Sequence, residues 1–235
     1  MMEKVCMESI ARYVFEAGML KRVKRSGWWA ESVRDPESVA DHSFRTAVVA
    51  CMLAKMEGMD GAAANRLCAA AVFHDMHEAR LGDLHKITAR YIRISKELER
   101  RVESEQMDDL PDGVRKAVTG VLDLTDDERI ILKDADYLEC AFQAREYADI
   151  GHKGAKTWIK NIGERLKTTS AKRLHARMMG MDPNSWWKGL PSGPTTCRIE
   201  PPSGTSASMC VVLPTARKMM VMEPSRVSAS TMVSG

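Results

Sequence analysis

A histidine and an aspartate stand side by side in an apolar stretch of the sequence. His74 and Asp75 follow Ala-Val-Phe in "AAVFHDMHEARLGD". Burying a polar group costs roughly 2–7 kcal/mol unless it is hydrogen-bonded, paired or bound to a metal. The pair therefore predicts partners elsewhere in the chain. A His-Asp dipeptide by itself is more often a hydrogen-bonded core pair than a pair of metal ligands, so the partners decide between the two interpretations.

Two further segments offer matching groups. His42 lies in "ESVADHSFRTA", close to the expected start of an apolar-periodic helix, and Asp134 and Asp136 interrupt the apolar run in "ILKDADYLECA". Two imidazoles and two carboxylates, the second being an aspartate near position 136, suit one divalent transition metal, either Mn, Co, Fe, Ni or Zn. Three polar interruptions of three separate apolar helices favour this metal site over an isolated core pair.

The elements that must position these residues are all predicted to be helices. Apolar residues recur every three or four positions, no segment alternates like a strand, and no internal repeat is visible, so the fold class is all-α. A helix over residues 61–81 places His74, His77 and Glu78 on adjacent turns. The other helices are expected at residues 10–17, 39–52, 95–107, 126–149 and 156–178, with Asp126 and Asp127 capping or opening the fourth of these.

Composition limits the classes of protein. A net charge of +3 in 235 residues gives no support for a nucleic-acid partner. No run approaches the roughly 18 apolar residues of a membrane span, and the N-terminal segment lacks the apolar core of a signal peptide, so no membrane partner is expected. The cysteines form no CxxC pair, which suits reduced thiols in a cytoplasmic protein. They are Cys6, Cys51, Cys68, Cys140, Cys197 and Cys210.

The last part of the chain differs from the rest. Residues 188–235 are rich in Ser, Thr, Pro and Gly and hold six of the nine prolines, whereas residues 1–187 hold the helical patterns. Such a segment buries too little apolar surface to offset its ordering entropy, so disorder is expected. We expect one helical domain over residues 1–187 and assign no role to the tail.

The order His42, then His74-Asp75, then Asp136 resembles the H…HD…D signature of the HD-domain metal-dependent phosphohydrolase superfamily. Within it, "LKRVKRSGWW", "VRDPESVADHSFR", "AAVFHDMHEARLGDL" and "LKDADYLECAFQAREY" are similar to the 5'-deoxynucleotidase subgroup, over about residues 11–148. The resemblance implies a single HD-domain helical bundle with His42, His74, Asp75 and Asp136 as metal ligands. Asp136 is preferred to Asp134 because "LKDAD" aligns with a Lys-x-x-Asp pattern in the family.

The resemblance also implies roles for four further residues. Glu78 matches the family's catalytic acid, and Asp83 in "LGDL" matches a second acid near the scissile phosphate. Arg25 and Trp28 match an Arg-Trp pair that holds the nucleotide, although here "SG" is inserted between them. Relatives often have proline soon after "GDL", where this chain has "HKITARYI", so the substrate-side loop is expected to differ. A homodimer is implied as well.

The expected reaction is hydrolysis of deoxyribonucleoside 5'-monophosphates to deoxynucleoside and phosphate by a phosphoric monoester hydrolase. Four protein ligands leave room for substrate or water only at five- or six-fold coordination. One alternative is a cyclic phosphodiesterase that acts on a cyclic nucleotide or a pterin phosphate, since the same metal site can attack a diester. Another is a non-catalytic, metal-stabilised helical interaction module. Glu78 and Asp83 argue against the module, because a structural site needs no acids beside its ligands.

Overall fold

The structure is a computed structural model that describes residues 2–190, with side chains described from Cys6 onward. Its contacts divide the chain into two units, Met1–Trp186 and Trp187–Gly235. The predicted disordered tail therefore lies almost wholly outside the described residues, and the domain boundary at residue 187 stays a prediction. Within the described residues, no helix is long and apolar enough to cross a bilayer.

The prediction of an all-α fold is confirmed, since the described residues form helices and no strand. The α-helices are α1 (Met2–Ala17), α2 (Val39–Met56), α3 (Gly61–Phe73), α4 (Glu78–Leu81), α5 (Lys96–Met107), α6 (Asp112–Leu122), α7 (Asp126–Asp149), α8 (Ala155–Gly163), α9 (Thr169–Met179) and α10 (Ser185–Lys188). Three 3₁₀ segments connect them: η1 (Gly18–Lys21), η2 (Ser26–Glu31) and η3 (Thr88–Arg90).

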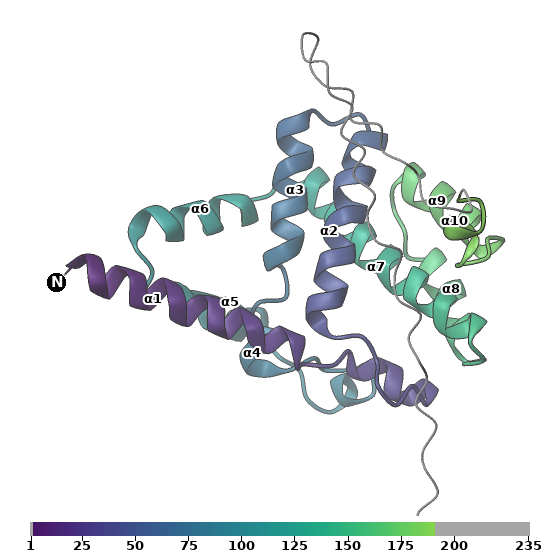
Figure 1. Cartoon of the computed structure of the whole chain (residues 1–235), viewed down its shortest axis with the longest axis horizontal. Coiled ribbons are helices and arrows are strands. Elements are labelled where there is room, and N and C mark those ends of the chain that lie inside the picture. Colours follow the sequence, from purple (N-terminus) through teal and green to yellow (C-terminus); the bar gives the residue numbers. More distant parts are fainter. Residues whose placement is uncertain (1, 191–235) are drawn as a thin grey trace, which may run out of the picture. The chain divides into compact units, whose positions relative to one another are not determined.

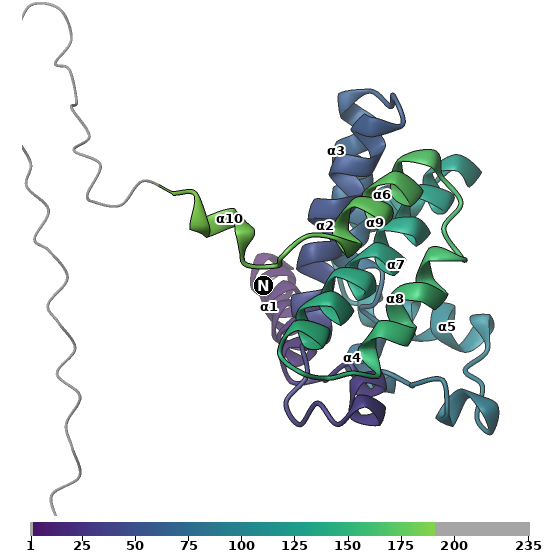
Figure 2. The same cartoon turned by 90° about the vertical axis from the view of Figure 1, so that its right-hand side faces the viewer.

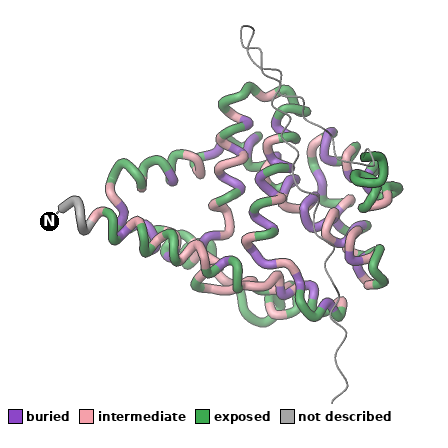
Figure 3. The backbone as a smooth tube through the Cα atoms, in the orientation of Figure 1, coloured by how far each residue is buried: buried purple, intermediate pink, exposed green. Residues whose placement is uncertain are grey.

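The main core lies where α2, α3 and α7 meet. α2 packs against both α3 and α7 (Figure 1), and α8 and α9 pack on α7 (Figure 2). The buried residues gather on these central helices (Figure 3). Many contacts are made by alanines, which allow the helix axes to approach closely. These are Ala47, Ala50 and Ala54 of α2, Ala64, Ala70 and Ala71 of α3, and Ala135, Ala141 and Ala144 of α7.

The helix starts are fixed by side-chain caps. The hydroxyl of Ser38 accepts a hydrogen bond from the backbone N–H of Asp41, whose carboxylate accepts one in return from the backbone N–H of Ser38, so α2 begins with a capping box. The same arrangement links Thr125 and Glu128 at the start of α7. Thr125, and not Asp126 or Asp127, is therefore the cap; Asp126 and Asp127 lie in the first turn.

The periodicity of α2 predicts the helix but does not identify its buried face. The apolar residues that recur at this spacing are Val39, Phe44, Val48, Cys51 and Met52, of which Phe44 and Met52 are 71% and 61% exposed. Val39 is buried as predicted, but the rest of the face toward the core is formed by the three alanines and Leu53, which is fully buried. Small residues carry less hydrophobic signal than Phe or Met, although they pack more closely.

The predicted helix over residues 61–81 is wrong in one respect, because it is interrupted. α3 ends at Phe73, and α4 begins only at Glu78. Between them the backbone bonds shorten to three-residue spacing, as in Glu78 N–H to Asp75 O at 3.0 Å. Nδ1 of His74 lies 2.7 Å from the carbonyl oxygen of Ala71, which an unbroken helix offers to the N–H of Asp75. The histidine thus competes with the backbone at the break.

The helix α6 is an element that the sequence patterns did not indicate. The predicted helix over residues 156–178 is also divided, into α8 and α9. Asp134, only 1% exposed, explains the division between α8 and α9. Its carboxylate accepts hydrogen bonds from the backbone N–H groups of Lys167 and Thr168, at 2.9 and 2.7 Å, and from the Thr168 hydroxyl at 2.8 Å. Asp134 therefore holds the chain just before α9 against α7.

Replacing Asp134 with alanine is expected to lower the free energy of unfolding by roughly 2–4 kcal/mol, because buried backbone donors lose their acceptor. Urea denaturation followed by circular dichroism measures this. Asp127→Ala, at an exposed position of the same helix, is the control and is expected to change stability by less than about 1 kcal/mol. Equal stability of the two variants would show that the Asp134 bonds contribute nothing.

Candidate active site

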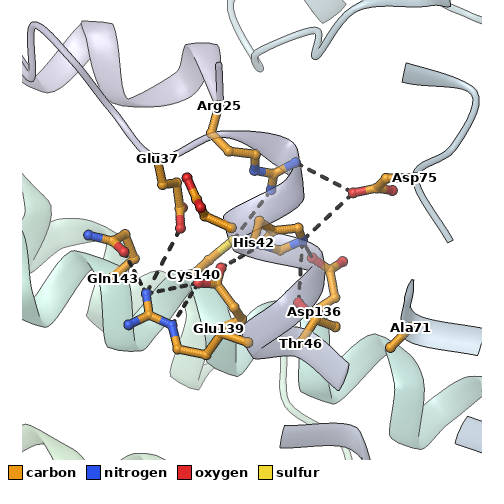
Figure 4. Close-up of polar contacts among 12 residues, drawn as sticks. Arg25, Glu37, His42, Thr46, Ala71, Asp75, Asp136, Glu139, Cys140 and Gln143 are labelled. Carbon is orange, nitrogen blue, oxygen red and sulfur yellow. Dashed lines mark hydrogen bonds and ion pairs between the residues drawn. The ribbon is translucent and has the colours of Figure 1, made fainter. Parts of the chain in front are cut away.

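Four side chains from the central helices converge beneath the break between α3 and α4. His42 comes from α2, His74 and Asp75 from the end of α3 and the following turn, and Asp136 from α7. Nε2 of His42 lies 3.2 Å from Oδ1 of Asp136 and 3.7 Å from Oδ2 of Asp75, and Nε2 of His74 lies 3.2 Å from the same Asp75 oxygen. Figure 4 shows His42, Asp75 and Asp136 pointing toward one another. The structure thus brings all four sequence-predicted ligands together.

The outer nitrogens of both histidines are held by the protein. Nδ1 of His42 lies 2.5 Å from Oε2 of Glu139, and Nδ1 of His74 lies against the Ala71 carbonyl. A proton on each Nδ1 leaves each Nε2 with a lone pair directed into the cluster. Nε2 of His74 is buried and has no hydrogen-bond partner among the described residues. Its close contact is the carboxylate of Asp75 at 3.2 Å, and a buried nitrogen that faces a carboxylate without a hydrogen bond fits a metal ligand.

The donor set fits a divalent metal. Two imidazole nitrogens and two carboxylate oxygens match the preferences of Mn, Fe, Co, Ni or Zn, and three of the donors, from His42, His74 and Asp136, lie within 4.8 Å of one another. The chemistry of these residues therefore agrees with one divalent metal, held by His42, His74, Asp75 and Asp136.

The electrostatics of the cluster favour positive charge. Burial and Arg25 lower the pKa of His42, but hydrogen bonding to Asp136 and Glu139 outweighs them and raises it well above its usual value. Burial raises the pKa of Asp136, yet the hydrogen bond from His42 and the charge of Lys133 hold it well below its usual range. A cation between these side chains is stabilised, whether it is a proton or a metal ion.

Glu139 is a site residue that the sequence patterns did not reveal. It is fully buried and accepts hydrogen bonds from His42 and from Nε of Arg45, the latter at 2.9 Å. Arg45 also donates to Gln143 and Glu146. The available signal was a lone glutamate in the apolar run "YLECAF", three residues after Asp136 and so on the same helix face.

Glu78 lies beside the ligand cluster at the start of α4. Ligand atoms of Asp75, His77 and Glu78 fall within 4.8 Å of one another, and Oε2 of Glu78 is buried without a hydrogen-bond partner among the described residues. Burial, together with the charge of Asp75, raises the pKa of Glu78 to about 9. A carboxyl group that keeps its proton at neutral pH can donate it as a general acid.

Arg25 and Asp83 form a connected pair at the edge of the cluster. Nη1 of Arg25 donates to Oδ1 of Asp83 at 3.1 Å and lies 3.8 Å from Oδ2 of Asp75. The other oxygen of Asp83 accepts from the backbone N–H of Ser26 at 2.6 Å and from its hydroxyl at 3.0 Å. Gly82 permits this approach with a φ of 74°, a conformation that favours glycine. Asp83 therefore fixes the guanidinium fork beside the ligands.

Trp28 lies inside the core and not beside the metal ligands. It is 1% exposed, its ring stacks on Trp158 at a centroid distance of 4.5 Å, and its edge meets Tyr147 at 5.1 Å. Its indole N–H donates to Glu37 at 2.9 Å. In this structure Trp28 supports the 3₁₀ segment that carries Ser26, directly after Arg25. Its predicted contact with the nucleotide stays a prediction.

Comparisons with known proteins identify the family and relatives of this chain. The model of the HD domain family matches residues 17–178. Human 5'-deoxynucleotidase HDDC2 is 35% identical over 153 residues, which cover 62% of this chain and 71% of the human protein. The zebrafish 5'-deoxynucleotidase HDDC2 is 27% identical over 183 residues, covering 74% and 85%.

Solved structures show the same fold. The crystal structure of genomics APC5600 has a TM-score of 0.64 and 36% identity, covering 77% of this chain and 99% of that chain. The predicted coding region AF1432 of Archaeoglobus fulgidus has a TM-score of 0.54 and 31% identity over the same shares. An all-α bundle with converging His, His-Asp and Asp residues defines a class of metal-binding helical domains. The chain belongs to the HD domain family.

Changing Glu139 to glutamine is expected to weaken metal affinity by about 10- to 100-fold, because the acceptor that orients His42 loses its charge. Competition with a chromophoric chelator measures the affinity. Glu146→Gln is the matched control, since Glu146 pairs with Arg45 but does not touch His42. Equal affinities for the Glu139 and Glu146 variants would contradict the orienting role of Glu139.

Proposed function

We propose that the protein is a metal-dependent 5'-deoxynucleotidase, which hydrolyses deoxyribonucleoside 5'-monophosphates to deoxynucleoside and phosphate. The observation that carries this proposal is the convergence of the four-ligand cluster with Arg25, Glu78 and Asp83 at its edge. The names of the human and zebrafish relatives support the same substrate class.

The reaction forms a bond from a water oxygen to phosphorus and breaks the bond from phosphorus to the 5'-oxygen. The water gives up a proton, and the leaving oxygen takes one. His42, His74, Asp75 and Asp136 would hold a divalent metal, which would supply Lewis acidity to the phosphate and the attacking water. The physiological metal, among Mn, Co, Fe, Ni and Zn, remains a prediction.

The side chains around the cluster divide the remaining tasks. Arg25 presents a planar fork that can donate two hydrogen bonds to phosphate oxygens. Glu78, whose pKa is raised to about 9 by burial and Asp75, keeps its proton at neutral pH, so it can give that proton to the leaving oxygen and take one back from the water. The carboxylate of Asp83 accepts bonds from Arg25 and Ser26, which supports a positioning role in addition to its predicted contact with the leaving oxygen.

The metal-loaded protein is expected to release inorganic phosphate from deoxynucleoside 5'-monophosphates, measured with a colorimetric phosphate assay across Mn, Co, Fe, Ni and Zn. Glu78→Gln is expected to lower kcat by about 10²–10⁴-fold, the usual contribution of a general acid–base group. The variant retains its metal, which elemental analysis checks. Glu97→Gln, at a fully exposed position of α5, is the control.

Two results of this assay would contradict the proposal. Cleavage of cyclic phosphates without cleavage of any monophosphate would favour the cyclic phosphodiesterase. Bound metal without cleavage of any phosphate ester would favour the non-catalytic interaction module.

Assembly and location are also part of the proposal. We propose a homodimer in the cytoplasm; the exposed apolar residues Phe44, Met52 and Met56 on α2 support a contact with a second copy. The free thiols of Cys6, Cys51, Cys68 and Cys140 suit a reducing compartment.

Phe44→Asp combined with Met52→Asp is expected to shift the protein from dimer to monomer in sedimentation equilibrium, because two carboxylates cannot be buried in an apolar contact. Val14→Asp on α1, where Val14 is 63% exposed, is the control. A monomeric wild-type protein would contradict the dimer, and a double variant that stays dimeric would contradict this face.

A further inference from the structure

Three basic side chains lie on segments near the metal ligands, and the reaction described above uses none of them. Lys86 lies in the loop after α4, Lys133 in α7, and Arg165 just after α8. Three segments that are distant in the sequence therefore each contribute one positive charge to the same part of the molecule.

The three cations are placed by two aromatic rings. Nζ of Lys133 lies 4.8 Å from the centroid of the Tyr137 ring, and Cζ of Arg165 lies 5.9 Å from it. Nζ of Lys86 lies 5.3 Å from the centroid of the Trp158 ring. Rings at these distances attract cations and hold them in place. The positions of the charges are thus defined by packing.

One of the three cations, Lys133, directly contacts a predicted metal ligand. Nζ of Lys133 lies 2.6 Å from Oδ2 of Asp136, whose other oxygen contacts His42. On the other side, Gly27 packs so closely on Trp158 that an added Cβ atom there comes within 2.7 Å of the ring. Trp158 therefore lies beside the segment that carries Arg25, and Lys86 lies over Trp158. Lys133 therefore lies beside the predicted ligand Asp136, Arg165 shares the Tyr137 ring with it, and Lys86 lies near the segment that carries Arg25.

Lys86 and Arg165 have no carboxylate partner among the described residues. Ion pairs with acidic groups are formed by Lys133 and by Arg25, but not by these two. Burial lowers the pKa of Lys86, and the positive charges of Arg165 and Lys133 lower it further. Like charges held together repel one another, and a bound anion relieves the repulsion.

Phosphate esters differ in the charge that they bring to such a group. A phosphate monoester carries about 1.5 to 2 negative charges at pH 7, whereas a phosphodiester carries one. The electrostatic free energy of approach scales with the charge of the ligand. Resting on the function proposed above, we propose that Lys86, Lys133 and Arg165 form an anion-selective entrance that gives the site its preference for doubly charged monoesters over singly charged diesters.

The test uses Lys86→Gln combined with Arg165→Gln, which leaves Lys133 and its contact with Asp136 intact. Lys172→Gln combined with Arg173→Gln removes the same charge from exposed positions on α9 and is the control. The substrates are p-nitrophenyl phosphate, a monoester, and bis(p-nitrophenyl) phosphate, a diester, with the metal-loaded protein in buffers of low and high salt.

For the entrance variant, kcat/KM for the monoester is expected to fall about tenfold at low salt, at the lower end of electrostatic steering. For the diester the expected fall is about threefold, since half the charge gives half the free energy. kcat stays unchanged, and both losses shrink in 1 M salt, where the Debye length is about 3 Å. Equal losses on both esters, losses that salt does not reduce, or the same losses in the control would overturn the proposal.

Binding gives a second readout that does not depend on turnover. Calorimetric titration of the metal-loaded protein with inorganic phosphate and with dimethyl phosphate compares a largely doubly charged with a singly charged anion. The entrance variant is expected to lose several-fold more affinity for phosphate than for dimethyl phosphate, whereas equal losses contradict the proposal. If wild-type protein cleaves p-nitrophenyl phosphate but no deoxynucleotide, the proposed function fails while the entrance is still tested by these measurements.

Discussion

The hydrogen bond between Nδ1 of His42 and the buried carboxylate of Glu139 is the interaction on which the site depends. Both side chains are fully buried, so neither can turn toward water if the other is displaced. The bond fixes Nε2 of His42 toward Asp75 and Asp136 and joins α2 to α7. Arg45 balances the charge of Glu139 from the other side. A buried charge is tolerated only with such partners, and the core of alanines brings the helices close enough to supply them.

The interruption after Phe73 is the second constraint. In a continuous helix, His74 and Asp75 point about 100° apart, and Glu78 follows one turn later. In the observed turn, the ring of His74 lies against the carbonyl of Ala71, and the carboxylate of Asp75 reaches both histidine Nε2 atoms within 3.7 Å. The short helix α4 then places Glu78 beside Asp75. The interruption of the helix thus brings the predicted ligands His74 and Asp75 and the acid Glu78 together from a single stretch of ten residues or fewer.

Sequence patterns predicted the all-α fold, most helix positions and the four residues that converge. They could not predict the break after Phe73, because the stretch from Ala62 to Leu81 contains neither glycine nor proline, and the competing contact comes from a side chain. Asp134 and Asp136 lie two residues apart in one apolar run, so the residue pattern alone left both open, and only the family resemblance favoured Asp136. Their contacts separate them, since Asp134 accepts backbone bonds near Thr168 while Asp136 faces His42. Glu139 could not be predicted, because a single glutamate in an apolar run does not reveal its partner. The burial of Trp28 could not be predicted either, since it depends on Trp158, which lies more than a hundred residues away in the sequence.

We propose that His42, His74, Asp75 and Asp136 hold one divalent metal. Crystals grown with Mn and measured at its absorption edge test this directly through anomalous diffraction. We expect a single strong peak in contact with Nε2 of His42, Nε2 of His74 and carboxylate oxygens of Asp75 and Asp136. A peak bound elsewhere, for example between Glu139 and Cys140, or none at saturating Mn, would contradict it.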